Sequence, residues 1–202
     1  VHGGTGSDNL YLMDGVPLYT VGHLAGVFSS FNSDVIENVD FYKSGFPARY
    51  GGRMSSVVDV TTRDGDFNDY SGTFSIGLIE GRIQMEGPIV KGKTSFNFGL
   101  RRSWLDVLTI PGFALYNALR DSENSDHTVM RYAMTDLNGK ITHKFSDDNT
   151  LSFSVFAGQD ALKSKSVSDP TDWDTAGNES NMELGLRWGN ILAYADVQDS
   201  IG

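Results

Sequence analysis

The sequence predicts a mainly β protein in two parts, a small α+β unit in residues 1–66 and about six antiparallel strands in residues 67–202. Two observations support this fold class. The first part has short runs of β-branched and aromatic residues separated by Gly, Pro and Asp-Gly turn signals. From Tyr70 onward, apolar and polar residues alternate with a period of two, as they do along strands whose two faces meet different surroundings.

Composition and charge narrow the class of protein. The chain has 23 Gly, 12 Phe and 8 Tyr among 202 residues, which does not fit a helical bundle. It has no apolar run near the roughly 18 residues of a membrane-spanning helix, a test that does not detect amphipathic membrane strands. The formal net charge of −10 argues against a nucleic-acid partner, because such binding depends on Lys and Arg. The lack of cysteine excludes disulfides and thiolate metal sites.

Local signals define the elements of the first part. Asp14 and Gly15 form a turn signal, and Pro17 cannot simply continue a strand. Ser33 is a candidate N-cap for a helix of one or two turns over Ser33–Glu37. Strands are expected over Leu10–Met13, Val39–Lys43 and Ser56–Thr62.

The second part contains six amphipathic runs. They are Thr73–Leu78, Arg82–Glu86, Ser95–Arg101, Thr135–Phe145, Leu151–Ala157 and Met182–Trp188. The alternation predicts one apolar face that includes Phe74, Ile76, Phe96, Phe98, Leu151, Phe153 and Val155. It predicts an opposite polar face that includes Gln84, Asn97, Arg101 and Lys140.

The connections between these runs differ in length. Residues 90–93 and 146–149 are expected as tight turns, and residues 105–128 and 161–180 as long loops at the opposite end of the strands. Membrane barrels have short periplasmic turns and longer extracellular loops in this arrangement. Glu80-Gly81 departs from it, as an expected tight turn at the long-loop end. A soluble sandwich also alternates, so the pattern alone leaves both architectures open.

Several motifs in a fixed order carry a family resemblance. They are DGVP at Asp14–Pro17, FPARYGG at Phe46–Gly52, and the strand Ser56–Thr62 followed by RDG at Arg63–Gly65. Together they resemble the C-terminal half of the plug domain of TonB-dependent outer-membrane transporters of the Bacteroidota type. The resemblance implies a plug fragment followed by about six antiparallel transmembrane strands of an incomplete large outer-membrane barrel. Transporters of this kind have about 22 strands, so we expect the chain to be one fragment.

The same resemblance implies a function and a set of partners. The expected function is uptake of a scarce solute, such as a siderophore, metal chelate, glycan or peptide, across the bacterial outer membrane. The implied partners are the remainder of the barrel and plug, TonB in the periplasm, outer-membrane lipid and an extracellular solute. A surface lipoprotein lid is a further candidate. The alternative is a non-transporting β-rich binding or adhesion domain.

We expect no enzymatic activity, no cofactor and no metal site. The sequence has no GxSxG elbow, HExxH motif or phosphate-binding loop, and its four histidines are far apart. A partial calcium-loop pattern from Asp172 to Glu183 has Ala176 at a ligand position, so an ordinary acidic loop is expected there.

The resemblance also assigns site residues. Lys43, and His2 where relatives carry arginine, are expected to pair with acids of the barrel wall as an electrostatic lock on the plug. A histidine with an ordinary pKa near 6.5 would be a weaker, pH-dependent partner. Tyr19, His23 and Phe28 are expected to contact ligand from a loop that faces outward in relatives. The alternatives are a solvated Lys43 and a Phe28 that packs within the plug.

Overall fold

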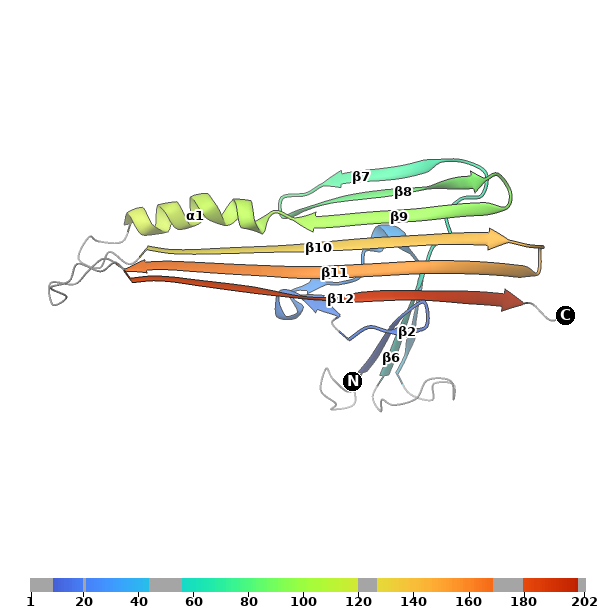
Figure 1. The fold of residues 1–202 in the computed structure, drawn as a ribbon, viewed down its shortest axis with the longest axis horizontal. Helices are drawn as coiled ribbons and strands as arrows, with labels where there is room; N and C mark the ends of the chain where they lie inside the picture. The colour runs from blue at the N-terminus through green and yellow to red at the C-terminus, as the bar shows by residue number, and fades with distance from the viewer. Residues whose placement is uncertain (1–8, 20, 44–55, 120–126, 169–179, 200–202) are drawn as a thin grey trace.

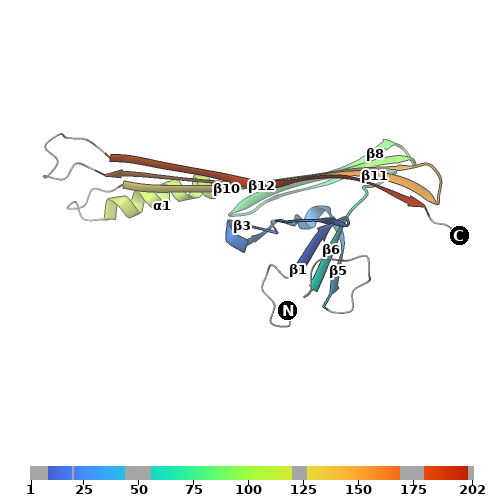
Figure 2. The ribbon, with the colours of Figure 1, turned by 60° about the horizontal axis from the view of Figure 1, so that its bottom comes forward.

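The computed structural model describes residues 9–19, 21–43, 56–119, 127–168 and 180–199. These residues form a small four-stranded sheet, a two-stranded hairpin and a large six-stranded sheet. The small sheet and the hairpin lie against one face of the large sheet (Figure 1, Figure 2). We call the segment 9–62 the small unit. The mainly β fold class predicted from the sequence is confirmed.

The small unit is built on a parallel pair of strands. β1 (Asn9–Met13) pairs in parallel with β6 (Ser56–Thr62), in the sheet order β2-β1-β6-β5. β2 (Val16–Pro17) returns antiparallel to β1. The turn between them has positive φ at both central residues, Asp14 (48°) and Gly15 (80°), as a type I′ hairpin turn requires.

The helix predicted over Ser33–Glu37 is wrong in length and in its cap. The structure has a single 3₁₀ turn, η3 (Ser33–Val35), and the N-cap is Asn32, whose side chain accepts a hydrogen bond from the Asp34 amide. From Ile36 the chain enters β5 (Ile36–Tyr42), which pairs antiparallel with β6, so that a helix of two turns does not form there. The remaining connection contains β3 (Gly22–His23), η2 (Leu24–Gly26) and β4 (Phe28–Ser29).

The large sheet is a six-stranded antiparallel meander, as predicted, with the order β12-β11-β10-β9-β8-β7. Its strands are β7 (Ser71–Ile76), β8 (Glu80–Val90), β9 (Thr94–Ser103), β10 (His127–Lys144), β11 (Asn149–Ser168) and β12 (Ser180–Asp199). The tight turns near residues 91–93 and 145–148 are confirmed. The tight turn predicted at Glu80-Gly81 is present but lies earlier, at residues 77–79 between β7 and β8, because Glu80 and Gly81 already belong to β8.

The two faces of the large sheet differ in burial, which confirms the predicted alternation. Directly opposite residues of an antiparallel pair share a face, so the register assigns every strand residue to a side. Gln84, Asn97 and Arg101 are buried on the side of the small unit, whereas Phe74 is 71% and Ile76 68% exposed on the other. We call the first side the inner face and the second the outer face.

The long loops predicted at residues 105–128 and 161–180 are wrong in part. The first contains the helix α1 (Leu105–Leu119), which runs beside the part of β10 that extends past the end of β9 (Figure 1). The second is shortened because β11 and β12 remain paired as far as Ser168 and Ser180. Among the described residues, no helix has the length and apolar character needed to cross a membrane.

Candidate functional site at the interface of the two sheets

An apolar contact holds the small unit against the inner face. Met13 and Leu18 of the small unit pack with Phe156 of β11, and all three are buried. Val35 comes so close to β9 that a Cβ atom added at Gly99 would lie 2.4 Å from its Cγ1 atom. Glycine is therefore required at this point of β9 for the small unit to seat fully.

A histidine bridges two buried carboxylates at this interface. His23 Nδ1 lies 2.9 Å from Asp160 Oδ2 on β11, and its Nε2 lies 2.8 Å from Asp136 Oδ1 on β10. The Nε2 contact has ion-pair distance without hydrogen-bond alignment. Because both ring nitrogens face carboxylate oxygens, a neutral ring would place a lone pair against one of them. The geometry therefore favours the imidazolium form.

Two further side chains complete this cluster. Arg101 on β9 donates to Asp136 Oδ2 from Nε (2.9 Å) and Nη2 (2.5 Å), and its Nη2 also donates to the Ser29 carbonyl (2.5 Å). The Tyr132 hydroxyl donates to Asp160. With His23 protonated, two cations face two carboxylates, so the buried charge is balanced. We call His23, Arg101, Tyr132, Asp136 and Asp160 the histidine cluster.

The pKa of His23 is raised above its ordinary value of 6.5. Burial by itself lowers the pKa, because it disfavours the charged ring. The contact and charge of Asp136, followed by those of Asp160, outweigh burial and produce the net rise. The electrostatic environment thus agrees with the protonation state that the contact geometry favours.

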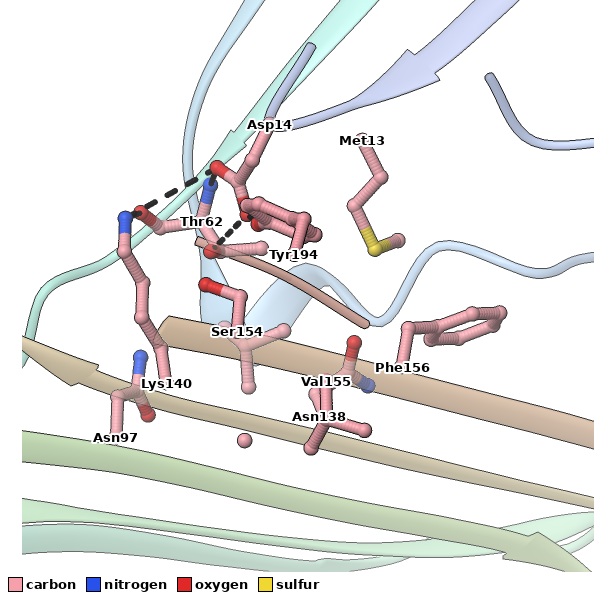
Figure 3. A pocket seen from close by; sticks show the side chains of 12 residues that line it. Met13, Asp14, Thr62, Asn97, Asn138, Lys140, Ser154, Val155, Phe156 and Tyr194 are labelled. Carbon is pink, nitrogen blue, oxygen red and sulfur yellow. Dashed lines mark hydrogen bonds and ion pairs between the residues drawn. The ribbon is translucent and has the colours of Figure 1, made fainter. Parts of the chain in front are cut away.

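A lysine of the large sheet forms a second polar contact with the small unit (Figure 3). Lys140 Nζ lies 2.7 Å from Asp64 Oδ1 and 3.9 Å from Asp14 Oδ1, and it donates to the Thr62 carbonyl at 2.9 Å. Asp14 accepts further bonds from the Thr62 amide (2.7 Å), the Thr62 hydroxyl (2.5 Å) and the Tyr194 hydroxyl. We call Lys140, Asp14, Asp64, Thr62 and Tyr194 the lysine cluster.

Burial raises the pKa of Asp14. The hydrogen bonds from Thr62 and the charge of Lys140 act in the opposite direction without cancelling the rise. In the lysine cluster the base is on the large sheet, and the acids are Asp14 on the small unit and Asp64 just after it. The predicted lock has the opposite polarity, with its base on the plug. A third contact, from Arg82 on β8 to Ser33 (3.0 Å) and Asp34 (3.4 Å), has the same polarity as the lysine cluster.

The residues predicted to form the site differ in solvent exposure and in their contacts. Tyr19 is 81% exposed, Phe28 is half-buried, and His23 is 2% exposed with both ring nitrogens against carboxylates. Lys43 is exposed just past the end of β5, without an ion pair to any described residue. His2 and the Phe46–Gly52 motif lie outside the described residues, as does most of the acidic segment before Glu183.

Sequence reasoning placed Arg101 and Lys140 on the polar face but did not identify their partners. The same alternation puts Asp136 on the face of Lys140, whereas Asp160 lies between the run predicted over Leu151–Ala157 and the loop predicted over residues 161–180. A usable signal was present, because Arg101, Asp136 and Lys140 are charged residues in the middle of amphipathic strands. Such charges face a polar or occupied interior and need partners there. Among the described residues, no group of His, Asp and Glu could hold a metal ion.

Comparisons with known proteins give a family match and a similar solved structure. Residues 1–58 match the TonB-dependent receptor plug domain. Among solved structures, the siderophore receptor PirA from Acinetobacter baumannii matches over 90% of this chain, with 12% sequence identity and a TM-score of 0.48. This chain spans 36% of the length of that receptor chain. No curated protein matches the sequence.

The N-terminal match covers most of the small unit. Residues 1–58 are similar to the plug domain of TonB-dependent receptors, and the β-strands of the large sheet follow them in this chain. The match agrees with the expectation of no enzymatic activity. We call the small unit the plug from here on.

Proposed function

We propose that this chain supplies the plug and the first wall strands of a TonB-dependent transporter in a bacterial outer membrane. The observation that carries the proposal is the two-sided character of the large sheet. Its inner face holds the plug through buried ion pairs, and its outer face over β7–β11 carries exposed apolar side chains. A wall strand between a polar interior and lipid requires this division.

The transported solute is proposed to be scarce and extracellular, such as a siderophore, metal chelate, glycan or peptide. Tyr19 is the best-placed ligand contact of the three predicted, because its aromatic ring is exposed on the plug. Phe28 is a secondary candidate. His23 has its ring nitrogens engaged by Asp136 and Asp160, so a ligand contact by His23 would require the histidine cluster to open.

The remaining partners follow from the same proposal. TonB in the periplasm would pull on the plug, and a surface lipoprotein lid fits the Bacteroidota type that the stretch Asp14–Gly65 resembles. Lys43 and His2 are proposed to pair with wall acids outside this chain. The exposure of Lys43 and the charged contacts already made by Lys140 and Arg82 support such an electrostatic retention of the plug.

Planar-bilayer conductance of the full-length receptor tests the proposal. The intact protein should insert and remain nearly closed, because the plug fills the pore. Deletion of the plug should produce a large, permanently open channel. If the protein does not insert, or if deletion of the plug leaves its conductance unchanged, the result would support the alternative of a non-transporting binding or adhesion domain.

A further inference from the structure

The outer face changes character along the strands of the large sheet. On β11 the outward residues from Leu151 to Ala161 are apolar except for Gln159, and the next two, Lys163 and Lys165, are charged. Ten residues span about 33 Å along a strand at about 3.3 Å each. At a tilt of about 40° this is about 25 Å of depth, which is the height of the apolar band of an outer-membrane barrel.

Basic residues gather on the outer face just beyond this band, on three neighbouring strands. The register places them toward the long-loop end of the sheet, and all of them are exposed. They are Arg131 on β10, Lys163 and Lys165 on β11, and Arg187 on β12. We call these four residues the basic row.

The pairing within the basic row is unfavourable without an anion. Arg131 and Lys163 are directly opposite in the register, and like charges in that position are destabilising. The inner face has a comparable pair, Arg82 opposite Arg101, but there each base has a carboxylate, Asp34 and Asp136 respectively.

The basic row has no such compensation in the described part of the chain. None of its four members forms an ion pair there, although Glu183 is directly opposite Lys165. Arg102, another outward base at the upper edge of the band, does have a partner, Asp106 at 2.9 Å. Among the residues that the structure describes, this positive patch therefore has no ion-paired carboxylate, and the proposed arrangement places it at the level of the membrane headgroups.

We propose that the basic row binds the phosphorylated headgroup of an outer-leaflet lipid. The inference rests on the proposed function, because the long-loop end is extracellular only in that arrangement. The phosphate would lie between Arg131 and Lys163, with Arg187 on the neighbouring strand. A guanidinium can hold two phosphate oxygens and an ammonium adds a compact charge. The acyl chains would cover the apolar outer face below.

Spin-labelled lipids provide the test, with the full-length receptor reconstituted in phosphatidylcholine vesicles. Electron paramagnetic resonance measures the lipid held at the protein surface. Spin-labelled phosphatidic acid should associate several-fold more strongly than spin-labelled phosphatidylcholine. Each basic residue near a membrane surface contributes about 1 kcal/mol, or about fivefold. In Arg131→Gln/Lys163→Gln most of this several-fold preference should be lost, and raised salt should weaken the preference of the wild type.

A matched control variant distinguishes a specific site from a diffuse charge effect, and a competing anion distinguishes a bound lipid from free phosphate. Lys91→Gln/Lys93→Gln removes the same charge from exposed residues at the opposite end of the sheet and should keep the preference. Equal loss in both variants would mean a diffuse charge effect and would overturn the site. Displacement of the lipid by inorganic phosphate at equal ionic strength would mean that the row binds a free anion, which would overturn the lipid assignment.

Membrane insertion is measured independently of lipid preference, so that the lipid-site proposal and the transporter proposal can be tested independently. Heat-modifiable migration on gels and the total amount of restricted phosphatidylcholine report a folded, inserted barrel. An inserted receptor without preference for phosphatidic acid refutes the lipid site and leaves the transporter proposal standing. A receptor that does not insert refutes both.

Discussion

His23 Nε2 and Asp136 Oδ1 lie 2.8 Å apart across the boundary between plug and wall, and both side chains are almost completely buried. The contact joins the hairpin β3–β4 of the plug to the middle of β10. Removing one partner from a buried charged pair leaves the other without compensation, at a cost of about 3–5 kcal/mol. The protonation of His23 is thus tied to the seating of the plug.

The first prediction concerns pH. The folded-state pKa of His23 is raised above 6.5, so its stabilising contribution is complete below about pH 6.5 and is lost as the pH rises through the raised value. The urea concentration that opens the pore in planar bilayers should therefore fall with rising pH in this range.

Two variants check that His23 is responsible. His23→Gln should open at lower urea and lose most of the pH dependence. His143→Gln alters a histidine on the outer face and should behave like the wild type. Persistence of the pH dependence in His23→Gln would assign it to another group.

The second prediction concerns the close approach of Val35 to β9. Gly99→Ala should destabilise the seated plug by about 1–3 kcal/mol, because the new methyl group overlaps Val35. Gly185→Ala, on a strand position with nothing within 4 Å, should have little effect. In the urea assay, the double variant Gly99→Ala/Val35→Ala should lose less than the sum of the single variants. Additive losses would contradict a direct contact.

The third prediction concerns the faces of the wall. Single cysteines at Asn97 and Phe98 are neighbours in β9 with side chains on opposite faces. A membrane-impermeant thiol reagent should label Asn97→Cys once the plug is deleted, because the plug buries that position. It should label Phe98→Cys in neither form, because the proposed function places that outward side chain against lipid. Ready labelling at Phe98→Cys would reverse the assignment of the faces.

The fourth prediction concerns ligand binding by Tyr19. Tyr19→Ala should weaken solute binding by about thirtyfold, the equivalent of the roughly 2 kcal/mol typical of a buried aromatic anchor. Tyr19→Phe keeps the ring and should retain most of the affinity if stacking dominates. Calorimetry with the identified solute gives both values. Unchanged affinity in Tyr19→Ala would move the binding site to the wall.

The fifth prediction concerns Lys43. Lys43→Ala should increase ion leak through the closed receptor, because a wall acid outside this chain would lose its partner. Lys91→Ala, an exposed lysine in the turn after β8, is the control and should leave the leak unchanged. Equal conductance of Lys43→Ala and the wild type in planar bilayers would make Lys43 a solvated strand-end charge.

The strands and their faces could be predicted from the sequence because the alternation is local. The strand Ser56–Thr62 was correct to the residue, and Gln84, Asn97, Arg101 and Lys140 were all placed on the correct face. Strand ends were harder, because β11 runs on through polar residues to Ser168. The helix α1 was not predicted because its sequence is predominantly apolar and includes Pro111, so that it lacks a clear helical period.

The charged residues of the candidate site could be predicted from the sequence, but their partners could not. Charged residues in the polar face indicated that partners were needed, but His23 and Asp160 are 137 residues apart and nothing local joins them. His23 is buried only because the plug packs against the large sheet, and the local sequence around His23 does not indicate that contact. The family resemblance indicated the loop that contains Tyr19 and His23 as the ligand contact. In the structure, the Tyr19 ring is exposed and the His23 ring is buried.

The lysine and histidine clusters also bear on the order of assembly. Every wall residue in them, from Arg101 to Tyr194, comes from β9, β10, β11 or β12, which follow β7 and β8 in the chain. A polypeptide made from its N-terminus therefore exposes the plug first and the strands that neutralise its buried charges within about the next 140 residues. In the proposed transporter, plug and wall would associate as a unit before any later strands, and barrel closure would enclose a plug that is already in place.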